Sequence, residues 1–91
     1  MLDRHCKPLL SPQVVLREEF DDWAVLFDPN TGEAYGLDPV GVFIAKNLDG
    51  KKSIVEIVGE LGELFDGIPP EVDEDALQFV HSLMQKGLAL I

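Results

Sequence analysis

Carboxylates are the most numerous side chains in this sequence with the capacity for chemistry. Glu56, Glu60 and Glu63 are spaced i, i+4 and i+7 in a segment of helical periodicity, which places them on one helix face. Paired carboxylates catalyse acid–base reactions when burial or a close neighbour perturbs the pKa of one of them. The other face of this segment is apolar, so we expect the three glutamates to face water. The pattern predicts a solvated surface and no catalytic residue.

Metal binding and thiol chemistry also lack the residues they require. Consecutive acidic residues at positions 73–75 would point around a helix, and the dipole at a helix start explains them more simply than calcium does. Structural zinc needs about four Cys or His ligands in spaced pairs. The chain has 1 Cys and 2 His, with His5 and Cys6 adjacent near the N-terminus and His81 far away. We therefore expect no bound metal and a bystander thiol at Cys6.

Length and charge narrow the classes of partner. Ninety-one residues, 46% of them hydrophobic, predict one folded domain, since a chain this short supports a single core. The net charge of −10 repels phosphate backbones and anionic lipids, so neither nucleic acid nor a membrane is an expected partner. A single cysteine excludes an internal disulfide and favours a cytoplasmic location. Residues 1–13 are predicted to be a flexible segment, followed by a domain at 14–91.

Three strands are predicted at the start of this domain. Residues 14–17 and 23–27 are rich in strand formers, and residues 28–32 combine proline, asparagine and glycine in the manner of a turn. A third strand at 33–37 follows. Gly36 weakens that strand and marks either a bulge or a place where another backbone approaches closely.

Three helices and a terminal strand follow. Asp38 and Pro39 predict the start of the first helix, and Ser53 with Glu56 forms a capping box for the second. Gly59 and Gly62 inside the second helix suggest a closely packed neighbour. A third helix ends at residues 86–87, and the apolar residues 88–91 are expected to form a strand that joins the sheet. The predicted fold is α+β and winged helix-turn-helix-like: a three-stranded antiparallel sheet, three helices and a short C-terminal strand.

Two spaced patterns resemble the signature of the PqqD family, small proteins of pathways that make cofactors and natural products from peptides. The first pattern is Leu37-Asp38-x-x-Gly41-x-x-Ile44-x-x-x-Leu48-Asp49-Gly50-x-x-Ser53-x-x-Glu56-Ile57. The second pattern, which resembles the C-terminal helix of that family, is Asp75-x-x-x-Phe79-x-x-x-Leu83-x-x-Lys86-Gly87-Leu88. Together they cover most of residues 14–91.

This resemblance implies a winged-helix-like RiPP recognition element, a non-catalytic domain that binds the leader of a ribosomally made precursor peptide and presents it to a modifying enzyme. In the synthesis of pyrroloquinoline quinone that enzyme is a radical S-adenosylmethionine protein, and no cofactor is expected on the chain itself. Family members bind the leader as an added strand beside the third strand, in a groove closed by the third helix. On this sequence the strand is Glu33, Ala34, Tyr35, Gly36 and Leu37, and the helix surface is Ala76, Phe79, Val80 and Leu83.

Two features of the residues favour the same interpretation independently. Gly36 allows a second backbone to approach, and the third helix has a wider apolar surface than one core requires. Core packing is the alternative explanation for both. Related domains often place basic residues on this helix, whereas the chain has Asp75, Gln78, His81 and Gln85, so we expect positive charge on the bound peptide or the partner enzyme. Two alternative functions stay open: a winged-helix DNA-binding regulator and a generic protein-interaction module. The oligomeric state, monomer or homodimer, also stays open.

Overall fold

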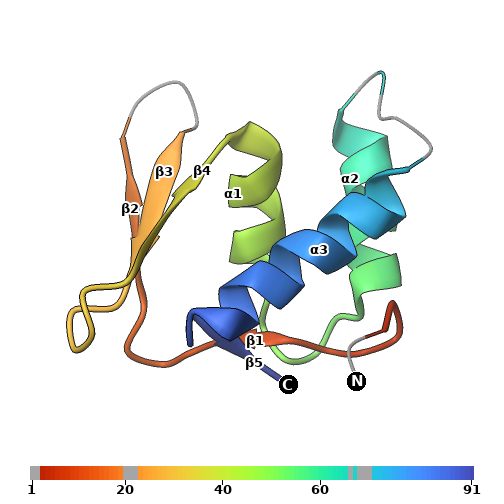
Figure 1. Ribbon diagram of the computed structural model, residues 1–91. Helices are drawn as coiled ribbons and strands as arrows, with labels where there is room; N and C mark the ends of the chain where they lie inside the picture. The colour runs from red at the N-terminus through yellow and green to blue at the C-terminus, as the bar shows by residue number, and fades with distance from the viewer. Residues whose placement is uncertain (1–2, 20–22, 66, 68–70) are drawn as a thin grey trace.

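The computed structural model describes residues 3–19, 23–65, 67 and 71–91. Its elements follow the chain as β1 (Leu9–Leu10), β2 (Val15–Glu18), β3 (Ala24–Phe27), β4 (Ala34–Leu37), α1 (Pro39–Lys46), α2 (Ile54–Leu64), α3 (Val72–Gln85) and β5 (Ala89–Leu90). The α+β fold and its predicted order of strands and helices are confirmed. Figure 1 shows the sheet on one side of the molecule and α3 crossing the other helices.

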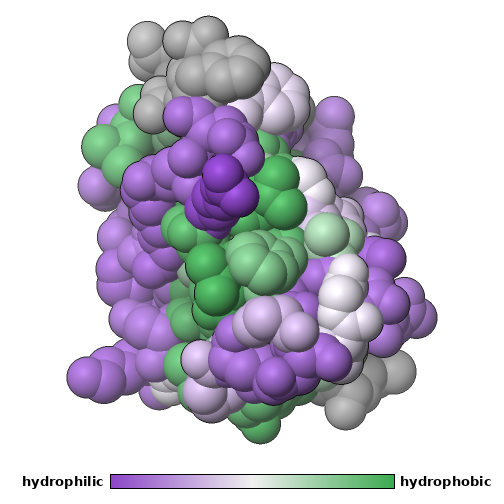
Figure 2. Space-filling model, turned by 90° about the vertical axis from the view of Figure 1, so that its left-hand side faces the viewer, coloured by the Kyte–Doolittle hydropathy of each residue, from purple (hydrophilic) through white to green (hydrophobic). Residues whose placement is uncertain are grey.

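The main sheet is antiparallel, with the strand order β2-β3-β4. Leu26 of β3 lies opposite Tyr35 of β4, and Ala24 lies opposite Leu37, so these side chains share one face. Ala24, Leu26 and Leu37 are at most 3% exposed and form the sheet's share of the core. On the opposite face Val15 is 42% exposed. Figure 2 views this side of the molecule and shows an apolar strip between polar surfaces.

The turn between β3 and β4 is fixed by Asp28, whose side chain is buried. Its carboxylate accepts hydrogen bonds from the Gln13 amide at 3.0 Å and from the Asn30 backbone N–H at 2.8 Å. These bonds hold the pKa of Asp28 below its ordinary value, and the bond from Gln13 has the largest effect. Gly32 closes the turn with a φ of 80°, a left-handed conformation that glycine adopts without strain.

Both predicted helix starts are confirmed by their hydrogen bonds. Asp38 Oδ1 accepts from the Gly41 N–H at 2.7 Å, with Pro39 at the first helical position. Ser53 Oγ accepts from Glu56 N, and Glu56 Oε1 accepts from Ser53 N, which completes the capping box. The helices then bury apolar faces against the sheet and against each other, with α3 packed on α2. The core therefore lies between the sheet and the helix layer.

The C-terminal strand differs from its prediction. Instead of joining the main sheet, β5 pairs antiparallel with β1 in a separate two-stranded sheet, with Leu9 opposite Leu90. The chain before β1 is bonded to the start of α2, where Ile54 N donates to Cys6 O at 3.2 Å. Of the segment 1–13 predicted to be flexible, residues 1–2 lie outside the described part. Residues from 3 onward belong structurally to the fold, so the boundary at residue 14 does not separate them from it.

The expectation for two glycines of α2 is wrong. A Cβ built on Gly59 or Gly62 would meet no atom within 4 Å, apart from immediate neighbours and the helix's own backbone. Both residues are exposed. No described element packs closely enough to require glycine at either position. Nothing in the structure explains these glycines.

Candidate functional site: an open strand edge beside a groove

β4 forms one edge of the main sheet, and no described strand pairs with its outer side. The Asp28 N–H donates to Glu33 O at 2.9 Å, which sets the alternation of hydrogen-bonded pairs along β3 and β4. By this alternation the pairs Leu26–Tyr35 and Ala24–Leu37 exchange hydrogen bonds between β3 and β4. The N–H and C=O groups of Ala34 and Gly36 therefore point away from β3. They are available to another extended backbone.

A groove of about 550 Å³ lies beside this edge, between β4, α1 and α3. β4 and the residues flanking the sheet contribute Trp23, Tyr35, Gly36, Leu37 and Asp38; α1 contributes Val40, Gly41 and Ile44; and α3 contributes Val72, Asp75, Ala76 and Phe79. The lining is thus largely apolar and aromatic, as in sites that bind organic ligands or peptide side chains.

Aromatic side chains give the groove its shape. The rings of Tyr35 and Phe79 meet edge to face, with centroids 5.7 Å apart and an interplanar angle of 74°. This contact joins β4 to α3. Trp23 also lines the groove and is 50% exposed, although it is among the largest apolar side chains of the protein. Exposed aromatic groups of this kind often anchor a binding partner.

The structure brings together five of the nine residues predicted to bind peptide, namely Tyr35, Gly36, Leu37, Ala76 and Phe79. Ala34 lies on the open edge outside the groove lining, and Glu33 precedes β4 with its carboxylate 3.5 Å from Lys86 Nζ. Val80 and Leu83 are 0% exposed and belong to the core. Their placement on a peptide-facing helix surface is therefore corrected: they face the core side of α3.

Sequence reasoning missed residues that also line the groove, among them Trp23, Val40, Ile44 and Val72. Helical periodicity marked the α1 residues as apolar, and nothing in that pattern separates a groove floor from a core. Trp23 offered a usable signal, because a large aromatic residue next to an acidic segment at a strand start is well placed for exposure. Its position beside the groove depends on the tertiary fold.

Two further functions find no matching feature within the described part of the chain. It contains no group of three or more His, Cys, Asp or Glu side chains arranged to hold a metal ion. None of its helices is long and apolar enough to cross a membrane.

The fold and the groove define a class of small α+β domains in which an open-edged sheet and a helix flank a cleft. A family model described as "Coenzyme PQQ synthesis protein D (PqqD)" matches residues 24–89. The chain belongs to this PqqD family. The match runs from the start of β3 to the first residue of β5 and includes every residue of the groove except Trp23.

Relatives and solved structures agree with this assignment. The chain is 29% identical over 89 residues to the PqqA binding protein of Xanthomonas euvesicatoria pv. vesicatoria (strain 85-10), covering 96% of this chain and 94% of the relative. It is 31% identical over 68 residues to the PqqA binding protein of Xanthomonas campestris pv. campestris (strain B100), covering 75% and 71%.

Two solved structures share the fold. The structure of TbiB1 in complex with the TbiA(beta) leader peptide superposes with a TM-score of 0.73 at 33% sequence identity, covering 89% of this chain and 93% of that chain. Lasso peptide synthetase B1, complexed with its leader peptide, gives a TM-score of 0.75 at 24% identity, covering 93% and 99%. At that lower identity the second likeness speaks for the fold alone.

Proposed function

We propose that this protein is a non-catalytic adaptor that binds the leader of a ribosomally made precursor peptide. The observation that carries the proposal is the open edge of β4 directly beside an aromatic groove. A relative of similar length bears the name PqqA binding protein, and TbiB1, at 33% identity, was solved with a leader peptide. The same binding function accounts for the geometry of this chain.

The leader adds to the sheet as a strand beside β4. The outward N–H and C=O groups of Ala34 and Gly36 pair with its backbone, which supplies affinity independent of sequence. Successive side chains of a strand alternate between faces, so every second leader residue enters the groove, at intervals of about 7 Å. Tyr35 and Phe79 receive an apolar side chain there. The groove thus supplies the sequence preference.

We extend the proposal to the partner that receives the peptide. A modifying enzyme, of the radical S-adenosylmethionine type if the pathway is that of pyrroloquinoline quinone, takes the bound precursor from this chain. The chain catalyses no step itself and works in the cytoplasm, where ribosomal peptides are made. We assign peptide binding to residues 14–91 in a winged-helix-like arrangement, with residues 3–13 packed against them through β1.

The DNA-binding alternative has no support in the described residues. A recognition helix presents Arg or Lys to phosphates and bases. α3 instead carries Asp73, Glu74 and Asp75 in its first turn and has no basic residue in its last turn.

Substitution of Gly36 tests the proposal with a matched control. Gly36→Pro removes an N–H that points away from β3, so the sheet keeps its own hydrogen bonds. Gly36→Ala keeps the N–H, and its Cβ meets no atom within 4 Å apart from its chain neighbours. We expect Gly36→Pro to weaken leader binding about tenfold or more, because a lost backbone bond and a blocked register cost roughly 1–3 kcal/mol. Gly36→Ala should lose much less affinity than Gly36→Pro, because its outward N–H is still available to the leader.

The probe is the precursor that immobilised protein retains from lysate of the producing cells, identified by mass spectrometry. Its leader is then synthesised and titrated by fluorescence anisotropy. Equal affinity of the proline and alanine variants would exclude the β4 edge. Retention of duplex DNA, with no peptide, would refute the proposed function itself.

A further inference from the structure

The groove is chemically different at its two ends. Tyr35 and Phe79 form the apolar end. The lining also includes Asp38, three residues after Tyr35 and directly after β4, and Asp75, one helical turn before Phe79 in α3. We refer to this part of the groove as its acidic end. These two aspartates are the only charged residues in the described lining, which contains no Lys or Arg. A ligand lying along β4 therefore meets an apolar surface and then a doubly acidic one.

Both carboxylates retain capacity to accept hydrogen bonds from a ligand. Asp38 Oδ1 accepts from the Gly41 N–H at 2.7 Å, and its second oxygen has no partner among the described residues. The Asp75 carboxylate makes no hydrogen bond or ion pair within the described part of the chain, and the residue is exposed. Its neighbour Asp73, by contrast, lies 3.6 Å from the Arg4 guanidinium.

An exposed aromatic residue lies at the same acidic end. Trp23 immediately precedes Ala24, and Ala24 pairs with Leu37, the residue before Asp38. The indole is half exposed and lines the groove together with both aspartates. A Lys or Arg side chain is attracted to an indole face as well as to carboxylates. The combination of features suits a cation better than a neutral polar group.

We propose that Asp38, Asp75 and Trp23 form a subsite for a Lys or Arg side chain of the leader peptide. This inference rests on the proposed function and specifies the substrate it selects. Tyr35 and Asp38 are three residues apart, about 10 Å along a strand. Same-face residues of the added strand are about 7 or 13 Å apart, so the basic residue lies two or four positions from the apolar residue at Tyr35 and Phe79.

The experiment selects ligands from a displayed library of random dodecapeptides on immobilised wild-type protein. Enriched peptides are resynthesised, each also with its basic residue replaced by glutamine, and both forms are titrated at low and high salt. We expect an apolar residue and a Lys or Arg at the stated spacing. The glutamine form should bind about five- to tenfold more weakly at low salt, with a smaller ratio at high salt, because a partly exposed charge pair is screened.

Variants of the protein assign this preference to the subsite. Asp75→Asn should remove most of the ratio between basic and glutamine peptides, whereas Glu74→Gln, one residue away and outside the groove lining, should leave it unchanged. Asp38→Asn is the second variant, because asparagine still caps a helix while the charge is lost. Thermal melts check that each variant is folded.

The outcomes separate this inference from the proposed function. Enriched peptides with the apolar residue but no basic preference, or an unchanged ratio in both Asp75→Asn and Asp38→Asn, would overturn the subsite and leave the groove's function intact. A library that yields no binding peptide would count against peptide capture itself, and the subsite would fall with it.

Discussion

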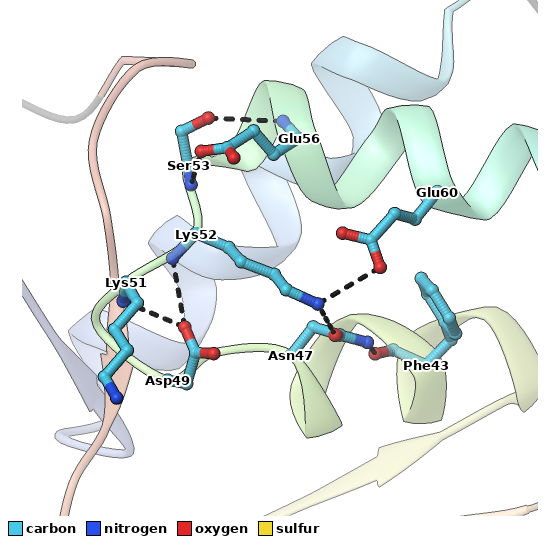
Figure 3. A network of polar contacts seen from close by, with 8 residues as sticks. All are labelled: Phe43, Asn47, Asp49, Lys51, Lys52, Ser53, Glu56 and Glu60. Atoms are coloured by element: carbon cyan, nitrogen blue, oxygen red, sulfur yellow. Dashed lines mark hydrogen bonds and ion pairs between the residues drawn. The ribbon is translucent and has the colours of Figure 1, made fainter.

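The corner between α1 and α2 and the groove between β4 and α3 are built by opposite means. At the corner, polar groups no more than eight positions apart in the chain are bonded to one another in a dense network, shown in Figure 3. At the groove, the contact between Tyr35 and Phe79 joins residues far apart in the chain, and the edge of β4 keeps backbone groups unpaired within the described part. In the first region the polar groups are bonded to one another, whereas in the second the outward backbone groups of β4 are available to a partner.

The corner's hydrogen bonds are local and specific. Asp49 Oδ1 accepts from the backbone N–H groups of Lys51 at 2.8 Å and Lys52 at 3.0 Å. Those bonds hold the pKa of Asp49 below its ordinary value, and the bond from Lys51 N has the largest effect. Lys52 Nζ then bridges the two helices, with Asn47 Oδ1 at 2.8 Å and Glu60 Oε1 at 3.1 Å. The network therefore fixes how α1 meets α2.

This difference has a consequence for binding. α1 contributes Ile44 to the groove, so a well-held α1 gives the groove a fixed floor. A preformed site loses less conformational entropy when a ligand binds. The hydrogen bonds of the corner thus help to hold the groove in its shape. We predict that substitutions at the corner affect stability and that substitutions at the groove affect binding.

The largest effect should come from α3, which serves both core and groove. Leu83→Ala removes a fully buried side chain and should lower the free energy of unfolding by about 2–5 kcal/mol. Phe79 is only partly buried, so Phe79→Ala should cost less stability but weaken leader binding. Urea unfolding and peptide titration measure the two quantities. If Phe79→Ala destabilises as much as Leu83→Ala and binds leader normally, the division of α3 is wrong.

Locally encoded features could be predicted from the sequence. The Asp38 cap and the capping box of Ser53 and Glu56 depend on residues three positions apart, so a short motif contains all the information. The turn chemistry at residues 28–32 is of the same kind. These features fixed the order of the elements and hence the fold class.

Features decided by the packing of distant segments could not be predicted. Helical periodicity showed that α3 has a wide apolar surface, but it could not distinguish Val80, which faces the core, from Phe79, which faces the groove. β1 pairs with β5, which is far from it in the sequence, and nothing in two short apolar segments indicates that they pair with each other. The groove's general position came from a family resemblance, whereas Trp23 required the tertiary structure.

Removal of the capping box should weaken the corner alone. Ser53→Ala deletes the acceptor for Glu56 N and should lower stability by about 1 kcal/mol, with leader affinity unchanged. The hydrogen bond from Ser53 N holds the pKa of Glu56 below its ordinary value, so this bond stabilises the fold at neutral pH. That contribution is lost as pH falls through the folded-state pKa. Ser53→Ala keeps this backbone N–H, so the pH test uses Glu56→Ala, which removes the carboxylate that accepts the bond. The difference in urea midpoint between wild type and Glu56→Ala should shrink in acid; a constant difference would contradict the coupling.

The smallest effect should be a gain in stability at a position outside both regions' contacts. Gly59 lies inside α2, is exposed, and a Cβ there meets no atom within 4 Å apart from its chain neighbours and the helix's own backbone. Gly59→Ala should therefore raise the free energy of unfolding by about 0.5–1 kcal/mol, since alanine loses less backbone entropy in a helix. Gly32→Ala is the control: space is equally open there, but a φ of 80° strains alanine, so this variant should be less stable. A loss of leader binding in Gly59→Ala would show instead that this face of α2 takes part in recognition. Binding would then not be confined to the groove between β4 and α3.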